Sequence, residues 1–240
     1  MTEKPDATVV LVHGSWGGGW VWDEVVASMT GAAGRILVPT LTGLGDRTHL
    51  IDENIDHELH AEDVIQTVEF ADAAAIVLVG HSYGGLVASA VACRIPEKIR
   101  SLVIVDGFLA ETGRSVFDLH PEIRAITEPL LNPTAPWQIM PLPASALGLP
   151  DGPQAERHDA RTRPMPIRTH STPFRHDMAR LTTIDRHYIR CTDFPIFAAT
   201  AEKAERQGWR RGDIETGHMV MFTQPGELAR KIEEIATMEG

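Results

Sequence analysis

The feature that most constrains this chain is a serine held between two glycines at the end of a run of strand-forming residues. Residues 76–79 are four consecutive aliphatic residues, and the pattern Gly80-x-Ser82-x-Gly84 follows directly. Residues 86–92 then continue as an apolar helical segment. This setting predicts a sharp strand-to-helix turn that presents Ser82 as a nucleophile. The glycines leave room for close packing, and the amides at the helix start point toward the serine.

Strands and helices alternate along most of the sequence. Aliphatic runs predict strands at residues 8–12, 35–39, 76–79, 99–105, 187–193 and 209–214. Helical spacing of apolar residues predicts helices at residues 20–29, 57–70, 86–92, 199–207 and 226–238. This order predicts an α/β fold with a mainly parallel central sheet flanked by helices. Ligands bind such sheets beyond the carboxyl ends of the strands, where the loops that begin at His13, Pro39, His81 and Asp106 meet.

The alternation stops between residues 108 and 181, which hold most of the prolines. We expect this segment to be an inserted cap, with short helices near residues 115–119 and 122–131, over a core formed by residues 1–107 and 182–240. Its large apolar residues favour a cover over a pocket, and Phe108 and Trp137 are candidate substrate contacts. The alternative is a poorly ordered surface excursion, which so many apolar side chains disfavour.

Composition excludes several classes of function. The 240 residues carry a formal net charge of −11, which is unfavourable for binding nucleic acid or an anionic membrane. Cys93 and Cys191 form no disulfide framework or zinc motif, so we expect reduced thiols. The short, charged residues 1–8 lack the pattern of a signal peptide, and no apolar run predicts a membrane span. We expect a cytoplasmic protein with a small-molecule partner, and a homodimer through the apolar cap stays open.

A nucleophilic serine needs an imidazole base and a carboxylate that orients the imidazole. His218 follows the last predicted strand, where the base stands when the chain order is serine, acid, histidine. Asp193 ends the preceding strand and is the expected acid. Asp106 is the main alternative, followed by Asp213 and Glu215, because several strand ends carry acids.

The other histidines have simpler explanations. We expect His13 and His81 to be structural residues beside the glycine-rich turns. His57 and His60 stand one helical turn apart, but no third ligand completes a metal set, so a solvated helix start is expected instead. We therefore predict neither a metal nor a cofactor. Trp16 lies inside the turn after the first strand and is a candidate substrate contact.

Taken together, His13-Gly14, the Ser82 motif and Gly217-His218 resemble the α/β-hydrolase superfamily. Residues 13–22, 39–47 and 188–192 are similar to bacterial carboxylesterases that include pyrethroid hydrolases, relatives of the plant methyl esterases and hydroxynitrile lyases. The resemblance implies a helical cap and a Ser-His-Asp/Glu triad, and it supports Asp193 as the acid of that triad. It also implies an oxyanion hole formed by the amides of Ser15 and Tyr83.

The resemblance implies a carboxylesterase that cleaves an ester of a small, largely apolar molecule through an acyl-enzyme. The lyases of the group carry a threonine and a lysine where this chain has Gly14 and Met219. Hydrolysis is therefore favoured, and Met219 is a further candidate substrate contact. A lyase or biosynthetic cyclase acting on a natural-product intermediate is the alternative, and a ligand-binding protein without catalysis is a third class.

Overall fold

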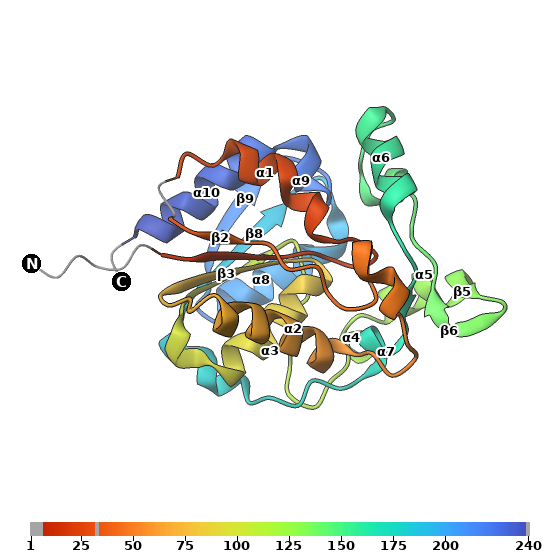
Figure 1. The fold of residues 1–240 in the computed structure, drawn as a ribbon, viewed down its shortest axis with the longest axis horizontal. Helices are drawn as coiled ribbons and strands as arrows, with labels where there is room; N and C mark the ends of the chain where they lie inside the picture. Colours follow the sequence, from red (N-terminus) through yellow and green to blue (C-terminus); the bar gives the residue numbers. More distant parts are fainter. Residues whose placement is uncertain (1–6, 32–33, 239–240) are drawn as a thin grey trace, which may run out of the picture.

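The computed structural model describes residues 7–31 and 34–238. Its centre is a parallel sheet with the strand order β2 (Ile36–Leu37), β1 (Val9–Val12), β3 (Ile76–His81), β4 (Ile99–Val105), β8 (Asp185–Cys191) and β9 (Arg210–Ile214). One face carries α1 (Asp23–Ser28), α9 (Val220–Thr223) and α10 (Pro225–Thr237), and the other carries α2 (His57–Phe70), α3 (Tyr83–Arg94) and α8 (Ala198–Arg206) (Figure 1). The predicted α/β fold with a mainly parallel sheet is confirmed.

The central strands are buried on both faces, which explains their continuous aliphatic sequences. Every residue of β1 and β3 is buried, and β4 has one half-buried position, Arg100. Two of the differences between predicted and observed strands matter for the site and the sheet edge. The edge strand β2 has two residues instead of five, and β8 ends at Cys191, two residues before its predicted end. The second difference places Asp193 beyond the strand, in the following loop.

A second layer lies at the end of the sheet opposite Ala7 and Met238, beyond the carboxyl ends of the strands (Figure 1). It is built from the segment between β4 and β8, and Trp16 Nε1 joins it to the core by donating a hydrogen bond to the Ile139 carbonyl, 3.1 Å away. The sequence did not predict its small antiparallel sheet. The elements are α4 (Val116–Leu119), α5 (Pro121–Thr127), β5 (Leu131–Asn132), β6 (Ala135–Ile139), α6 (Pro153–Arg161), β7 (Met165–Pro166) and α7 (Arg168–Ser171).

The turn between β3 and α3 has the strained backbone that its sequence predicts. Ser82 has φ of 54° and ψ of −119°, a conformation that non-glycine residues rarely adopt. A side chain at Gly80 would collide with the Gly84 carbonyl. A Cβ atom at Gly84 would lie 2.5 Å from the Val12 carbonyl oxygen and 2.7 Å from that of His13. The two glycines therefore let the turn pack directly against the end of β1.

Two histidines fasten the loop after β2, His13 to the end of β1 and His60 to Tyr83 of this turn. His13 Nδ1 donates to the Gly14 carbonyl (2.9 Å), and its Nε2 accepts from the Leu41 amide (3.1 Å). His60 Nε2 donates to the Thr42 carbonyl, so its Nδ1 accepts from the Tyr83 hydroxyl; both distances are 2.8 Å. Burial lowers the pKa of His13 and of His60 to about 4. Both rings are therefore neutral structural groups at neutral pH.

The start of α2 is buried, contrary to its prediction. His57 and His60 are fully buried, so the expected solvated helix start is wrong. The apolar residues of the second layer cover this end of α2, since His57 stacks on Phe174 with ring centroids 5.9 Å apart.

Residues 1–6 of the predicted charged N-terminal stretch lie outside the described residues. Within residues 7–31 and 34–238, no helix combines the length and apolarity needed to cross a bilayer.

The close contact at Gly84 makes a direct stability prediction. We expect Gly84→Ala to lower the free energy of unfolding by about 3 kcal/mol, because its Cβ atom meets backbone atoms that cannot rotate away. Gly226→Ala is the matched control, because nothing lies within 4 Å of a Cβ atom there. Urea denaturation measures both variants. A Gly84→Ala protein as stable as the native one would contradict the packing described.

The buried histidines make folding stability depend on pH. The unfolded chain binds protons at His13 and His60 near their ordinary pKa of about 6.5, and the folded chain binds them only near pH 4. The free energy of unfolding therefore falls as pH drops from 7 to 5, by about 2 kcal/mol for each of these two histidines. Glu58, whose pKa is lowered to about 2 by the neighbouring His57 and His176, loses its contribution only below about pH 4.5.

Urea denaturation at pH 7 and pH 5 tests this dependence. In His13→Gln the free energies of unfolding at pH 7 and pH 5 should differ by about 2 kcal/mol less than in the native protein. His49→Gln changes an exposed histidine and should leave the difference as it is. Equal differences in the native protein and in His13→Gln would show that His13 is not a neutral, buried group.

Candidate active site

Hydrogen bonds from the neighbouring strand hold Ser82 at the carboxyl edge of the sheet. The Ser82 amide donates to the Val105 carbonyl at 3.0 Å, and the Ser82 carbonyl accepts from Gly85 (3.0 Å) and Phe108 (3.2 Å). The side chain is largely buried but reaches the cavity between the core and the second layer. The strained turn therefore aims the hydroxyl into an enclosed space.

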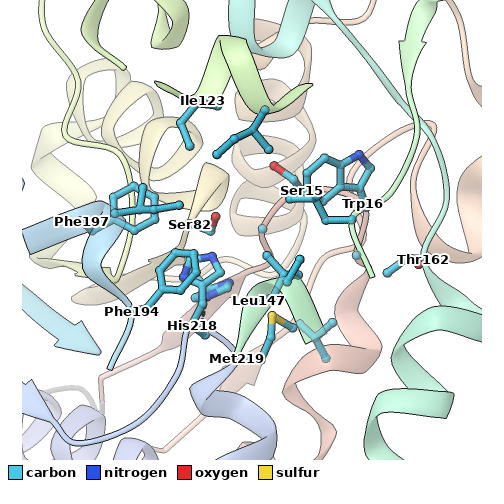
Figure 2. A pocket seen from close by; sticks show the side chains of 18 of the residues that line it. Ser15, Trp16, Ser82, Ile123, Leu147, Thr162, Phe194, Phe197, His218 and Met219 are labelled. Carbon is cyan, nitrogen blue, oxygen red and sulfur yellow. Dashed lines mark hydrogen bonds between the residues drawn. The ribbon is translucent and has the colours of Figure 1, made fainter. Parts of the chain in front are cut away.

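A buried carboxylate orients His218. Nδ1 of His218 lies 2.6 Å from Oδ2 of Asp106, and the second oxygen of Asp106 accepts from the Cys191 amide at 3.1 Å. Asp106 has no exposed surface and follows β4 with φ of 42°. A carboxylate only accepts hydrogen bonds, so Nδ1 carries the proton and the opposite nitrogen of a neutral ring has a free lone pair. Ser82 and His218 both line the cavity (Figure 2).

The prediction that Asp193 supports His218 is wrong. The Asp193 side chain is exposed, and its carboxylate accepts a weak hydrogen bond from Thr192 Oγ1 at 3.4 Å. The tight turn after β8 instead turns Phe194 toward the imidazole of His218, and the two rings stack with centroids 4.6 Å apart. Asp106, the main alternative from the sequence, takes the position of the acid.

The two remaining acid candidates are also excluded by position. Asp213 and Glu215 are both exposed, and Asp213 pairs with the Arg211 guanidinium at 2.9 Å. His81 is close to His218, with ring centroids 4.5 Å apart, but its Nε2 donates to the His218 carbonyl at 3.0 Å. Burial holds the pKa of His81 well below its ordinary value. His81 therefore supports the backbone of His218, in the structural role expected for it.

Ser15 and Tyr83 flank Ser82 as the sequence predicts. Tyr83 is the first residue of α3, so its amide has no partner within the helix. Ser15 follows Gly14, where a Cβ atom would lie 2.9 Å from the Cβ atom of Ser82. The loop after β1 and the start of α3 therefore border the serine from two sides, an arrangement that can hold an oxyanion.

The cavity has a volume of about 300 Å³ and is mostly apolar. Trp16, Phe108 and Met219 line it, as expected for substrate contacts, but Trp137 does not. Trp137 lies on β6 and is not among the residues of the cavity wall, so the structure does not support it as a substrate contact. The other large apolar residues of the wall are Ile123, Ile126, Leu142, Leu147, Phe194, Ile196, Phe197 and Met221.

Several lining residues were not identified from the sequence, and Phe194, Phe197 and His170 are among them. Phe194 and Phe197 follow β8, and His170 comes from α7 in the second layer. The turn signal Asp193-Phe194-Pro195 is present in the sequence, but it does not say which of its side chains faces the site. Among the described residues, no group of three or more His, Cys, Asp or Glu side chains is arranged to hold a metal ion.

Comparison with known proteins identifies related esterases. An esterase from Nocardioides sp. (strain SG-4G), described as carbendazim hydrolyzing, is 35% identical over 94% of this chain and 98% of its own length. Methylesterase 8 of Arabidopsis thaliana is also 35% identical, but over only 44% of this chain and 39% of its own. These relationships support esterase activity on this scaffold.

Solved structures share the fold. An extracellular α/β-hydrolase from a Paenibacillus species superimposes with a TM-score of 0.85 at 23% identity, covering 97% of this chain and 100% of its own. A pyrethroid hydrolase superimposes with a TM-score of 0.69 at 20% identity, covering 96% and 98% of the two chains. The model of the α/β hydrolase family matches residues 9–231. The chain therefore belongs to the α/β hydrolase family.

Proposed function

We propose that this protein is a serine carboxylesterase that cleaves an ester of a small, largely apolar molecule. The observation that carries the proposal is the buried hydrogen bond between His218 and Asp106 beside Ser82. A cavity of about 300 Å³ with aromatic and aliphatic walls suits a small apolar substrate. The similarity to named esterases over nearly the whole chain supports the same reaction.

The proposed mechanism has two acyl-transfer steps. Ser82 Oγ attacks the ester carbonyl while His218 takes its proton, and Asp106 stabilises the imidazolium that forms. The amides of Ser15 and Tyr83 donate hydrogen bonds to the oxyanion, aided by the positive end of α3. His218 then returns the proton to the leaving alcohol and activates a water molecule, which releases the acid and restores Ser82. No cofactor or metal takes part in these steps.

The position of Gly14 favours hydrolysis over cyanohydrin chemistry. The hydroxynitrile lyases that the sequence resembles carry a threonine there. In this chain a Cβ atom at Gly14 would be 2.9 Å from Ser82 Cβ and 3.0 Å from His81 Nδ1. The site has no room for that side chain in its present form. The general alternative of a lyase or cyclase on this scaffold predicts no ester turnover, so the assay below separates it from the proposal.

The partner and location are part of the same proposal. A net charge of −11 supports a small-molecule partner over nucleic acid or an anionic membrane. A cytoplasmic location is part of the proposal, because Cys93 and Cys191 are free thiols and do not form a disulfide. A homodimer stays a prediction that sedimentation can test.

Release of para-nitrophenol from its acetate and butyrate esters tests the reaction. The native protein should release nitrophenol, and Ser82→Ala should lower kcat/KM by at least about 10³-fold. Ser89→Ala is the matched control, since Ser89 lies on the same helix with its hydroxyl donating to the Gly85 carbonyl at 2.8 Å, away from the site. Its rate should stay within about threefold of the native rate. Release that persists in Ser82→Ala would refute the proposed nucleophile.

The proposed acid is tested separately through the reactivity of Ser82. A fluorophosphonate should label Ser82 in the native protein, and Asp106→Asn should slow labelling by about 10²- to 10⁴-fold, because the imidazole loses its orienting carboxylate. Asp193→Asn removes the exposed acid and should label at the native rate. Intact-protein mass spectrometry measures both rates. Slow labelling of Asp193→Asn alone would reverse the assignment of the acid.

A further inference from the structure

His170 of α7 has a hydrogen-bonding state that the structure fixes. Thr169 Oγ1 lies 2.6 Å from the Pro166 carbonyl, which only accepts, so the threonine spends its single proton there. Thr169 Oγ1 must then accept from His170 Nδ1, 2.9 Å away. The other ring nitrogen, Nε2, is left without a proton. His170 therefore presents a hydrogen-bond acceptor at this nitrogen.

Aromatic neighbours hold the ring in place. Tyr83 stacks on it with centroids 5.3 Å apart and planes 17° from parallel, and Phe108 meets it edge-on at 5.8 Å. Phe117 contacts it at 5.8 Å. Burial lowers the pKa of His170 to about 3, so the ring is neutral at neutral pH. A neutral imidazole packed among aromatic rings in a cavity wall is suited to recognising one polar group.

The acceptor faces the part of the cavity where the substrate carbonyl is expected. His170 Nε2 lies 3.4 Å from Ser15 Oγ, and both residues line the cavity. This hydrogen bond is long, because the donor–acceptor distance is usually about 2.7–3.2 Å. The amide of Ser15 is a proposed oxyanion donor, so a carbonyl oxygen held there brings its neighbouring substituent close to the Ser15 hydroxyl and His170.

Counting protons shows what this pair can recognise. The Ser15 hydroxyl has one proton and two lone pairs, and His170 Nε2 has one lone pair. The proton can satisfy only one acceptor, so the unmet capacity of the pair is for accepting hydrogen bonds. A substrate group that donates would be favoured there, and an apolar group would leave buried lone pairs without a partner.

We propose that His170 is a specificity-determining residue that selects esters with an O–H or N–H donor on the carbon next to the scissile carbonyl. The inference rests on the proposed esterase function and narrows its substrate class. The rest of the wall is mostly apolar and distinguishes substrates mainly by size and shape. The second layer thus contributes a polar contact to a reaction whose proposed chemical groups come from the core.

Two nearly isosteric esters test the inference. In para-nitrophenyl lactate the α-carbon carries a hydroxyl, and in para-nitrophenyl isobutyrate a methyl group replaces it. Each kcat/KM is divided by the rate constant for hydroxide-catalysed hydrolysis of the same ester, which removes the difference in intrinsic reactivity. The native protein should prefer the lactate by about tenfold or more. His170→Phe keeps an aromatic ring without the acceptor and should lower this preference to about twofold or less.

Two further variants sharpen the result. Thr169→Val does not replace a group in the cavity wall but removes the acceptor that fixes the His170 proton, so it should also lower the preference. It serves if His170→Phe does not fold. His158→Phe is the matched control, because it replaces a second histidine that lines the cavity. The preference should survive in this control.

The outcomes separate this inference from the proposed function. A native protein with Ser82-dependent nitrophenol release but no preference for the lactate would overturn the role of His170 alone. A preference that persists in both His170→Phe and Thr169→Val, or that disappears equally in His158→Phe, would also overturn it. If the native protein releases no nitrophenol from any of the esters, the esterase function itself fails.

Discussion

The whole site depends on how closely the turn after β3 packs against its neighbours. Gly84 touches the backbone at the end of β1, and a Cβ atom at Gly107 would lie 2.6 Å from the Ser82 carbonyl oxygen. These contacts bring the loops after β1 and β4 onto the strained serine. As a result, Ser15 and Asp106 reach one point of the sheet edge from different strands. The strain at Ser82 persists because the surrounding packing leaves the turn no alternative.

The sequence predicted the elements whose signals are local. The limits of α2 and β4 agree with the predicted ones to the residue, because helical spacing and aliphatic runs reflect contacts each element makes on its own. The Ser82 turn and His218 were found in the same way. Glycines stand beside a strand end at both positions, and these glycines indicate the backbone conformation of the turn.

The errors concern side-chain direction and tertiary cover, which local patterns do not encode. Asp106 and Asp193 both follow strands, and only the tertiary structure shows that Phe194 occupies the face of His218 while Asp106 meets its Nδ1 atom. His57 belongs to a charged helix start that Phe174 of the second layer covers. Trp137 is apolar and lies in that layer, yet it sits outside the cavity. Proline-rich sequence gave no periodic signal from which these positions could be derived.

The two layers divide the work of the proposed enzyme. The core holds Ser82, His218 and Asp106 on rigid strand ends, which fixes the reacting groups relative to one another. The second layer closes an apolar cavity above them and adds His170, whose proton position is set by Thr169. This division explains how a common scaffold can keep one reaction while its substrate preference changes through the covering segment.

The central claim is that His218 Nδ1 donates its hydrogen bond to Asp106 and not to Asp193. Proton NMR of ¹⁵N-histidine-labelled protein tests it most directly, because a short imidazole–carboxylate hydrogen bond moves its proton far downfield of the amide envelope. We expect one such resonance that is absent in His218→Ala and in Asp106→Asn and present in Asp193→Asn. A resonance that survives in Asp106→Asn and disappears in Asp193→Asn would contradict the account.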